Sequence, residues 1–339
     1  MKRLVHLGVW TVVLLGLSAP TPAEAKLKKV AQSGLKFLSN PVGARSAALG
    51  AASMAVTEDA SAIFWNPAGL ARLQTKTSAI FDATSGIADI NYFAGAVAYN
   101  AEDYGIFGVH ALVMDYGDFE RTELDASQNV VRGLGTFSPT AFALGVSYAR
   151  TMTDRFGFGA NLKWARLDLG TVTTQRSIDE PTERVDHVMN QVVFDVGVMY
   201  YTHIRGIRFG ASFRNFAREK KFVVEEFSPP LELKFGWAVD VIDLLSLHGL
   251  GPSHAFTFMS DFQHSRDFST RLHYGGEYWY RNTLALRGGY KSNYDEEDFT
   301  FGAGLKFHLQ EDYAVGFDYA FNDFGVFEEV HKFSLALDF

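Results

Sequence analysis

The sequence contains no cysteine, and this absence sets the first limits on its function. None of its 339 residues can form a disulfide, supply a thiol nucleophile or bind a metal as a thiolate. Basic residues are not in excess either, since the formal net charge is −8. Because a surface that binds nucleic-acid phosphates must be basic, we expect no nucleic-acid partner.

Long apolar runs are also missing, with one exception at the N-terminus. Outside residues 4–17, no stretch approaches the roughly 20 apolar residues that a membrane helix needs. The exception follows the basic Met1-Lys2-Arg3 and precedes Ala23-Glu24-Ala25, an A-x-A cleavage site. This pattern predicts a signal peptide over residues 1–25. The mature chain is therefore expected to be exported, either as a membrane barrel or as a soluble β protein.

Aromatic residues and glycine are abundant, and from residue 76 onward large apolar residues alternate with small or polar ones. The chain has 30 Phe, 14 Tyr and 31 Gly. The alternation is clearest in residues 141–149, 231–241 and 299–309. Alternation indicates strands with one apolar face. Because the opposite faces are rich in Gly, Ala and Ser, we expect the aromatic faces to meet lipid and the others to line a partly filled lumen.

The pattern predicts an all-β fold, a 14-stranded antiparallel transmembrane β-barrel over residues 76–339. An even number of strands is the rule for such bacterial barrels. All prolines in this part of the chain fall in loops or at strand starts, as strand pairing requires. The expected strands are 76–84, 88–99, 104–116, 138–151, 155–169, 190–201, 206–216, 231–241, 254–264, 270–280, 283–291, 298–309, 312–321 and 331–339.

The connections between these strands alternate in length. If both termini are periplasmic, internal turns are short, except for 242–253, which is long enough for a helical turn. Long external loops and short internal turns are typical of outer-membrane barrels, so we expect this location and contact with outer-membrane lipid. The external loops are then 85–87, 117–137, 170–189, 217–230, 265–269, 292–297 and 322–330.

The last strand ends in a phenylalanine carboxylate. Its apolar residues alternate up to Phe339. This ending resembles the signal that the outer-membrane assembly machinery reads, and we predict that role for Phe339.

The N-terminal residues 26–75 break the alternation. Residues 40–56 are mostly small, and an expected helix that starts near Thr57 ends at Asn66-Pro67, because the residue before proline disfavours helical geometry. We predict that residues 26–75 form a short helical hatch inside the lumen. The alternative is a periplasmic arm outside the barrel.

Two stretches of this segment resemble the N-terminal signature of the PorV/PorQ family. They are residues 43–50, GARSAALG, and residues 59–70, DASAIFWNPAGL. That family is related to the FadL-type transporters, fourteen-stranded barrels that have an N-terminal hatch and share an Asn-Pro-Ala motif. On this resemblance, the expected hatch motif comprises Gly43, Arg45, Gly50, Asp59, Asn66, Pro67 and Gly69.

The resemblance implies two alternative functions. PorV-like barrels belong to type IX secretion, and the expected partners are then secreted cargo proteins and secretion-machinery components. FadL-like barrels carry fatty acids or other hydrophobic small molecules, and a ligand pocket is then expected between hatch and wall, bounded by Ile63, Phe64 and Trp65. The residues do not decide between the two.

No catalytic motif stands out in the sequence. It contains no G-x-S-x-G, no H-E-x-x-H and no P-loop, so we predict neither an enzyme nor a cofactor or metal site. His273 and Glu277 share a strand face, which we interpret as a solvated lumen face. Charged residues of both signs are expected to line the lumen. A selective ion pore would have one dominant sign, so the pattern favours a filled lumen instead.

Overall fold

The fold is known from a computed structural model. It describes residues 33–124, 129–133, 135–174, 183–204, 206–222, 225–247, 253–309, 313–325 and 329–339. The predicted signal peptide and the first residues of the predicted hatch therefore lie outside the described residues. Among the helices of the described ranges, none is long and apolar enough to cross a membrane.

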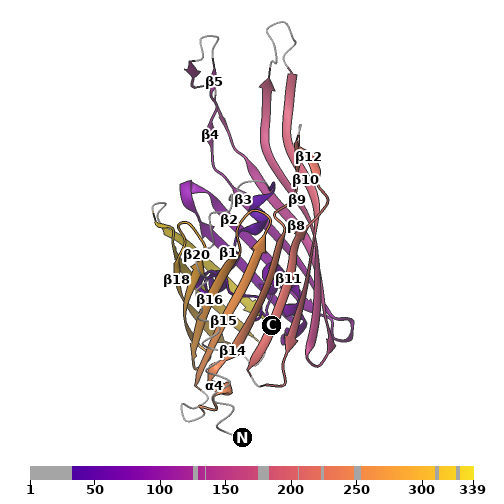
Figure 1. Cartoon of the computed structure of the whole chain (residues 1–339), viewed down its shortest axis with the longest axis vertical. Coiled ribbons are helices and arrows are strands. Elements are labelled where there is room, and N and C mark those ends of the chain that lie inside the picture. The colour runs from indigo at the N-terminus through magenta and orange to yellow at the C-terminus, as the bar shows by residue number, and fades with distance from the viewer. Residues whose placement is uncertain are drawn as a thin grey trace.

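Fourteen antiparallel strands form a closed barrel (Figure 1). Each strand pairs with its neighbours, and β1 pairs with β20 to close the wall. The fourteen predicted strands are all confirmed. In chain order they are β1 (Thr77–Ser85), β2 (Asn91–Asn100), β3 (Ile106–Asp115), β8 (Thr140–Thr153), β9 (Phe156–Thr174), β10 (Glu183–Tyr201), β11 (Ile207–Phe216), β14 (Glu232–Asp240), β15 (His254–Ser265), β16 (Arg271–Tyr280), β17 (Leu284–Ser292), β18 (Phe299–His308), β19 (Ala314–Asp323) and β20 (Glu329–Asp338).

The strands bury one face and expose the other. Phe299 and Phe301 of β18 are 55% and 56% exposed on the outer surface, whereas Thr300 between them is buried. The same alternation holds for Leu233 and Lys234 of β14. The apolar residues thus form the outer belt that a bilayer would cover, and the polar and small residues face inward.

The connections at the two ends of the barrel differ in length. At one end the turns are short, with η4 (Glu102–Tyr104) after β2 and the helical turn α4 (Val241–Leu244) after β14, as predicted. At the other end rise the two-stranded sheets β4 (Phe119–Glu120) with β7 (Thr136–Phe137), β5 (Glu123–Leu124) with β6 (Val130–Val131), and β12 (Lys220–Phe222) with β13 (Glu225–Phe227) (Figure 1). Since bacterial barrels keep short turns periplasmic, we assign the tall end to the cell exterior.

One predicted loop is largely strand. Residues 170–189 were expected to form an external loop, but β9 continues to Thr174 and β10 already starts at Glu183. This extension stands above the belt, where water meets both faces. The prediction was wrong because the apolar alternation that marks a membrane strand is not needed there.

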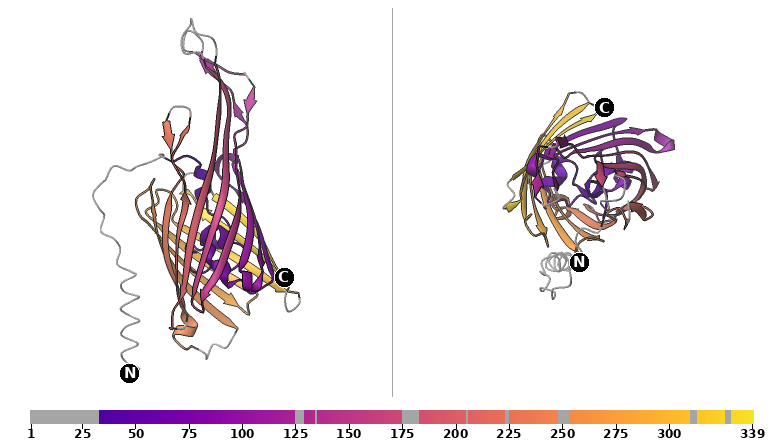
Figure 2. Two further views of the ribbon diagram at one scale, coloured as in Figure 1. Left: turned by 90° about the vertical axis from the view of Figure 1, so that its right-hand side faces the viewer. Right: turned by 90° about the horizontal axis from the view of Figure 1, so that it is seen from above.

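The N-terminal segment lies inside the barrel (Figure 2). Residues 33–76, here called the plug, contain η1 (Lys36–Ser39), α2 (Ala44–Ala48), α3 (Ala62–Trp65) and η2 (Pro67–Arg72). Almost all residues from Gly43 to Ala71 are buried. These helices are too short to be stable alone, so their conformation depends on packing against the wall.

Glycines of the wall make room for the plug. A Cβ at Gly289 of β17 would collide with the backbone of Leu49 and Gly50, and one at Gly210 of β11 would collide with the carbonyl of Met54. The abundance of glycine on inward faces therefore has a steric cause, because the plug backbone touches the wall backbone directly.

We predict that Gly289→Ala destabilises the protein and that the neighbouring Gly288→Ala does not. A Cβ at Gly288 points outward and meets only the Phe301 ring, at 3.9 Å. Overpacking at Gly289 is expected to lower the free energy of unfolding by about 1–3 kcal/mol. Urea unfolding of the folded barrel in detergent measures both variants. Equal stability of the two would contradict direct contact between plug and wall.

Candidate functional site

Arg45 of α2 connects the plug to the barrel wall through a network of ion pairs. The Nε and Nη2 atoms of Arg45 donate to the two carboxylate oxygens of Glu277 on β16, each at 2.8 Å. Glu277 also accepts from Arg287 on β17 at 2.7 Å, and Arg287 donates to Asp318 on β19 at 2.6 Å. The network therefore links the plug to three wall strands through charge-assisted bonds, which are stronger than neutral ones.

The environment of Arg45 holds it in the charged form. Burial opposes the charge, but attraction and hydrogen bonds from Glu277, with smaller contributions from Asp59 and Asp318, outweigh it and raise the pKa of Arg45 above its ordinary value. Arg45 is thus a fixed cation at every physiological pH. Its fork-shaped guanidinium matches the carboxylate in a way that lysine cannot.

The Asn66-Pro67 pair ends α3, and Asn66 binds the plug to the barrel wall. The side chain of Asn66 is fully buried; its Nδ2 donates to the carbonyls of Met54 and Val198, at 2.9 and 3.0 Å. Its Oδ1 accepts from the amide of Ala68, which caps η2 with Pro67 at the first helical position. One side chain thus joins two parts of the plug to strand β10.

The remaining residues of the predicted hatch motif shape the plug backbone. Gly43 and Gly50 have φ of +90° and +64°, which favour glycine, and they flank α2. Asp59 accepts from the amide of Ser61 at 2.8 Å just before α3. A Cβ on Gly69 would collide with the carbonyl of Thr57. Their place in a shared functional motif stays a prediction.

The three side chains expected at a ligand pocket are packed into the main hydrophobic core. Ile63, Phe64 and Trp65 are 2%, 5% and 2% exposed. The Trp65 indole donates to the carbonyl of Val42 at 2.8 Å, and the Lys234 ammonium lies 4.8 Å from its ring centre. A ligand pocket at these residues stays a prediction.

Wall side chains that the sequence did not single out bind the plug backbone. Asp261 of β15 accepts from the amides of Ser53 and Met54, at 2.7 and 3.0 Å. Thr300 of β18 accepts from the amide of Gly50 and donates to the carbonyl of Ala48. No local pattern could reveal these pairs, because about 200 or more residues separate the partners along the chain.

His273 and Glu277 do not form a solvated surface. They are 0% and 3% exposed, and His273 contacts the Gly50 carbonyl at 2.6 Å through Nδ1 and Gln263 through Nε2. The interpretation as a solvated lumen face was wrong, because the plug covers this part of the wall. Within the described residues, no group of three or more metal-binding side chains is found.

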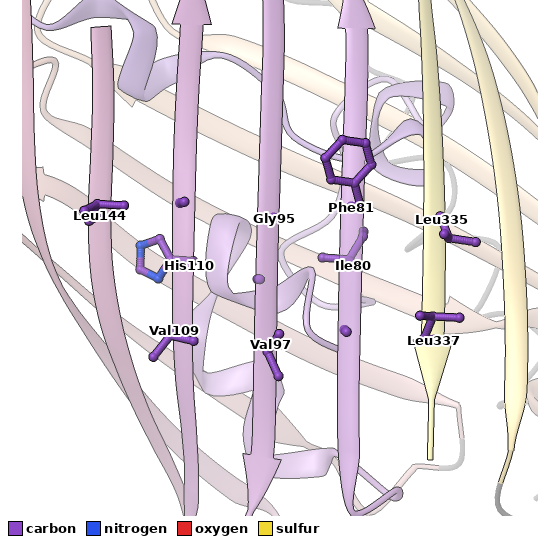
Figure 3. A pocket seen from close by; sticks show the side chains of 12 residues that line it. Ile80, Phe81, Gly95, Val97, Val109, His110, Leu144, Leu335 and Leu337 are labelled. Carbon is purple, nitrogen blue, oxygen red and sulfur yellow. The ribbon is translucent and has the colours of Figure 1, made fainter.

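In the described part of the chain, one cavity lies beside the plug and another lies in the wall around it. One, of about 400 Å³, opens at the periplasmic end between the plug residues Arg45 and Arg72 and the rim residues Lys306 and Asp338. The other, of about 470 Å³, is a depression in the outer wall over β1, β2, β3, β8 and β20, lined by Phe81, Val97 and Leu337 among others (Figure 3). Small residues on the outer face, such as Gly95, leave this depression, and membrane lipid would cover it.

Comparison with known proteins identifies the family. The family described as "Type IX secretion system protein PorV" matches residues 23–242, which include the plug and the first eight barrel strands. The chain belongs to the PorV family. No curated protein sequence matches it.

Solved structures similar to this PorV-family chain are FadL-like outer-membrane barrels. The toluene transporter TbuX of Ralstonia pickettii has a TM-score of 0.58 at 14% identity, covering 87% of this chain and 97% of its own. A FadL homologue of Pseudomonas aeruginosa has a TM-score of 0.54 at 11% identity, and the match covers 88% of this chain and 98% of the homologue. The toluene transporter TodX of Pseudomonas putida has a TM-score of 0.56 at 13% identity, and the match covers 92% of this chain and 99% of TodX. These likenesses show a common fold.

We predict that Arg45→Ala loosens the plug. Losing the bidentate bond to Glu277 is expected to cost about 1–3 kcal/mol, less than for a fully buried pair because the Arg45 side chain is 24% exposed. Hydrogen exchange of the α2 amides should then accelerate, with Arg45→Lys intermediate. The control is Lys76→Ala, whose partner Glu102 is 77% exposed, so that water screens the pair and its loss should leave the exchange of the α2 amides unchanged. Similar exchange in Arg45→Ala and the control would refute the anchoring role.

Proposed function

We propose that this barrel serves type IX secretion in the outer membrane, where it handles exported proteins at the cell surface and performs no catalysis. The family match supports the proposal, since it covers the plug and much of the wall. The proposal also takes residues 1–25 as a cleaved export signal and Phe339 as the assembly signal. Phe339 exchanges backbone hydrogen bonds with Thr77, where the first and last strands meet.

The observation that carries the proposal is the contrast between a filled lumen and a tall external surface. The plug is packed against the wall through glycine contacts, ion pairs and backbone bonds, which leaves little room for passage of a solute. The external sheets instead expose apolar side chains: Phe119, Val130 and Val131 are 45%, 57% and 40% exposed. Exposed apolar residues far from the bilayer are typical of surfaces that bind other proteins.

The test is to shorten the external segment 117–137 to a tight turn. If it contacts cargo, secreted proteins should accumulate inside the cell while the barrel still assembles. The matched control shortens 293–298, a small loop at the same end. Affinity purification of the intact barrel from outer membranes should also recover secreted proteins or secretion components. An unchanged secretome together with purification of the barrel alone would rule the proposal out.

The second candidate is transport of hydrophobic small molecules, favoured by the shared fold with the toluene transporters. It requires a ligand pocket beside Ile63, Phe64 and Trp65. Within the described residues, neither of the two cavities above is lined by these side chains. A hydrocarbon that copurifies against Phe64, together with reduced hydrocarbon uptake in a deletion strain, would support this candidate instead.

A further inference from the structure

A third cavity lies on the outer wall at the external edge of the apolar belt. It encloses about 530 Å³ between β9, β10 and the chain that leaves β11. Its position is independent of the plug and of the external sheets β4 to β7. We call it the rim groove.

The rim groove exists because two neighbouring strands end at different heights. Strand β10 pairs with β11 only from Phe194 downward, opposite Phe216, whereas β10 itself continues upward to Glu183. Beyond Phe216 the chain leaves the wall. Two bonds hold it near β10: Gln191 Nε2 donates to the Arg218 carbonyl at 2.9 Å, and Lys220 Nζ donates to the Asn190 carbonyl at 2.8 Å. The space between β10 and this departing chain is the rim groove.

The lower part of the rim groove is apolar. Trp164 of β9, Phe194 of β10 and Phe216 of β11 line it and are 42%, 48% and 53% exposed. On β9 the outward positions above Trp164 are Arg166 and Asp168, so the apolar belt ends at this tryptophan. Tryptophan at that level is typical of the interface between bilayer and water. The lower part of the groove therefore faces acyl chains.

The upper part of the rim groove is basic. Arg218 and Lys220 line it, and none of the described residues that line it is acidic. The intervening Glu219 is engaged elsewhere, since it accepts from Ser228 at 2.9 Å and from Arg266 at 3.1 Å. Arg166 beside the groove is balanced by Asp168 at 2.9 Å. The charged side chains that line the groove are thus both positive, although the whole chain is acidic.

We propose that the rim groove binds a membrane lipid with a phosphate-bearing head group. Its acyl chain lies along Trp164, Phe194 and Phe216, and its phosphate meets Arg218 and Lys220. Charge complementarity favours this occupant, because two basic side chains at the bilayer surface attract an anionic head group. The apolar part excludes free phosphate as the natural ligand, since half of the groove would then stay unfilled beside the bilayer.

Binding of dioleoyl phosphatidic acid to the purified full-length barrel in neutral detergent tests the proposal, with native mass spectrometry as the readout. Dioleoylglycerol has the same acyl chains without the phosphate and serves as the control lipid. The double variant Arg218→Gln/Lys220→Gln removes the basic edge. Arg132→Gln/Arg281→Gln removes the same charge from exposed positions elsewhere and is the matched control. The heat-dependent gel shift of folded barrels verifies folding of each variant.

The wild type should bind phosphatidic acid about thirtyfold more tightly than dioleoylglycerol, as expected for two basic residues at a membrane surface. Arg218→Gln/Lys220→Gln should lose this preference, the matched control should keep it, and excess inorganic phosphate should not displace the lipid. Trp164→Ala should weaken binding of both lipids. Equal binding of the two lipids by the wild type, a preference that survives Arg218→Gln/Lys220→Gln, or displacement by inorganic phosphate would overturn the proposal.

Discussion

The structure depends on the direct contact between the plug backbone and the inner wall. Short helices such as α2 and α3 cannot hold their shape in water, and their buried amides and carbonyls need partners. Side chains of the wall supply these partners. Asp261 accepts hydrogen bonds from two plug amides, and Thr300 accepts from one plug amide and donates to one plug carbonyl. Glycines at Gly210 and Gly289 bring the two backbones close enough for these bonds. The plug therefore takes its conformation from its contacts with the barrel wall.

This contact also explains the charges inside the barrel. Buried ions are costly unless they are paired, and the wall places several of them in pairs, such as Lys163 with Asp195 at 2.8 Å. Arg45 joins one such group from the plug, between Glu277 and the solvent of the periplasmic cavity. The buried charges inside the barrel thus include both signs, whereas a selective ion pore has one dominant sign at its constriction. Such a set of charges is suited to holding a plug in place.

The sequence predicted the barrel well because the membrane imposes a simple rule. Lipid on one side and a plug on the other force alternation, which is visible residue by residue in segments such as 299–309. Beyond the bilayer the strands need not alternate apolar and polar residues, so the sequence did not reveal that β9 and β10 continue there. The plug was predicted from its loss of alternation and its helix stop at Asn66-Pro67. Its partners were not, because Asp261 and Thr300 are ordinary inward residues until the fold brings the plug to them.

The central claim is that the plug fills the lumen. Single-channel recording in planar bilayers tests it directly by comparing the wild type with a variant that lacks residues 33–73. The wild type should show almost no steady conductance, and the variant should form a wide, persistently open channel without strong preference for anions or cations. A wild-type barrel that conducts as well as the deleted one would contradict the account.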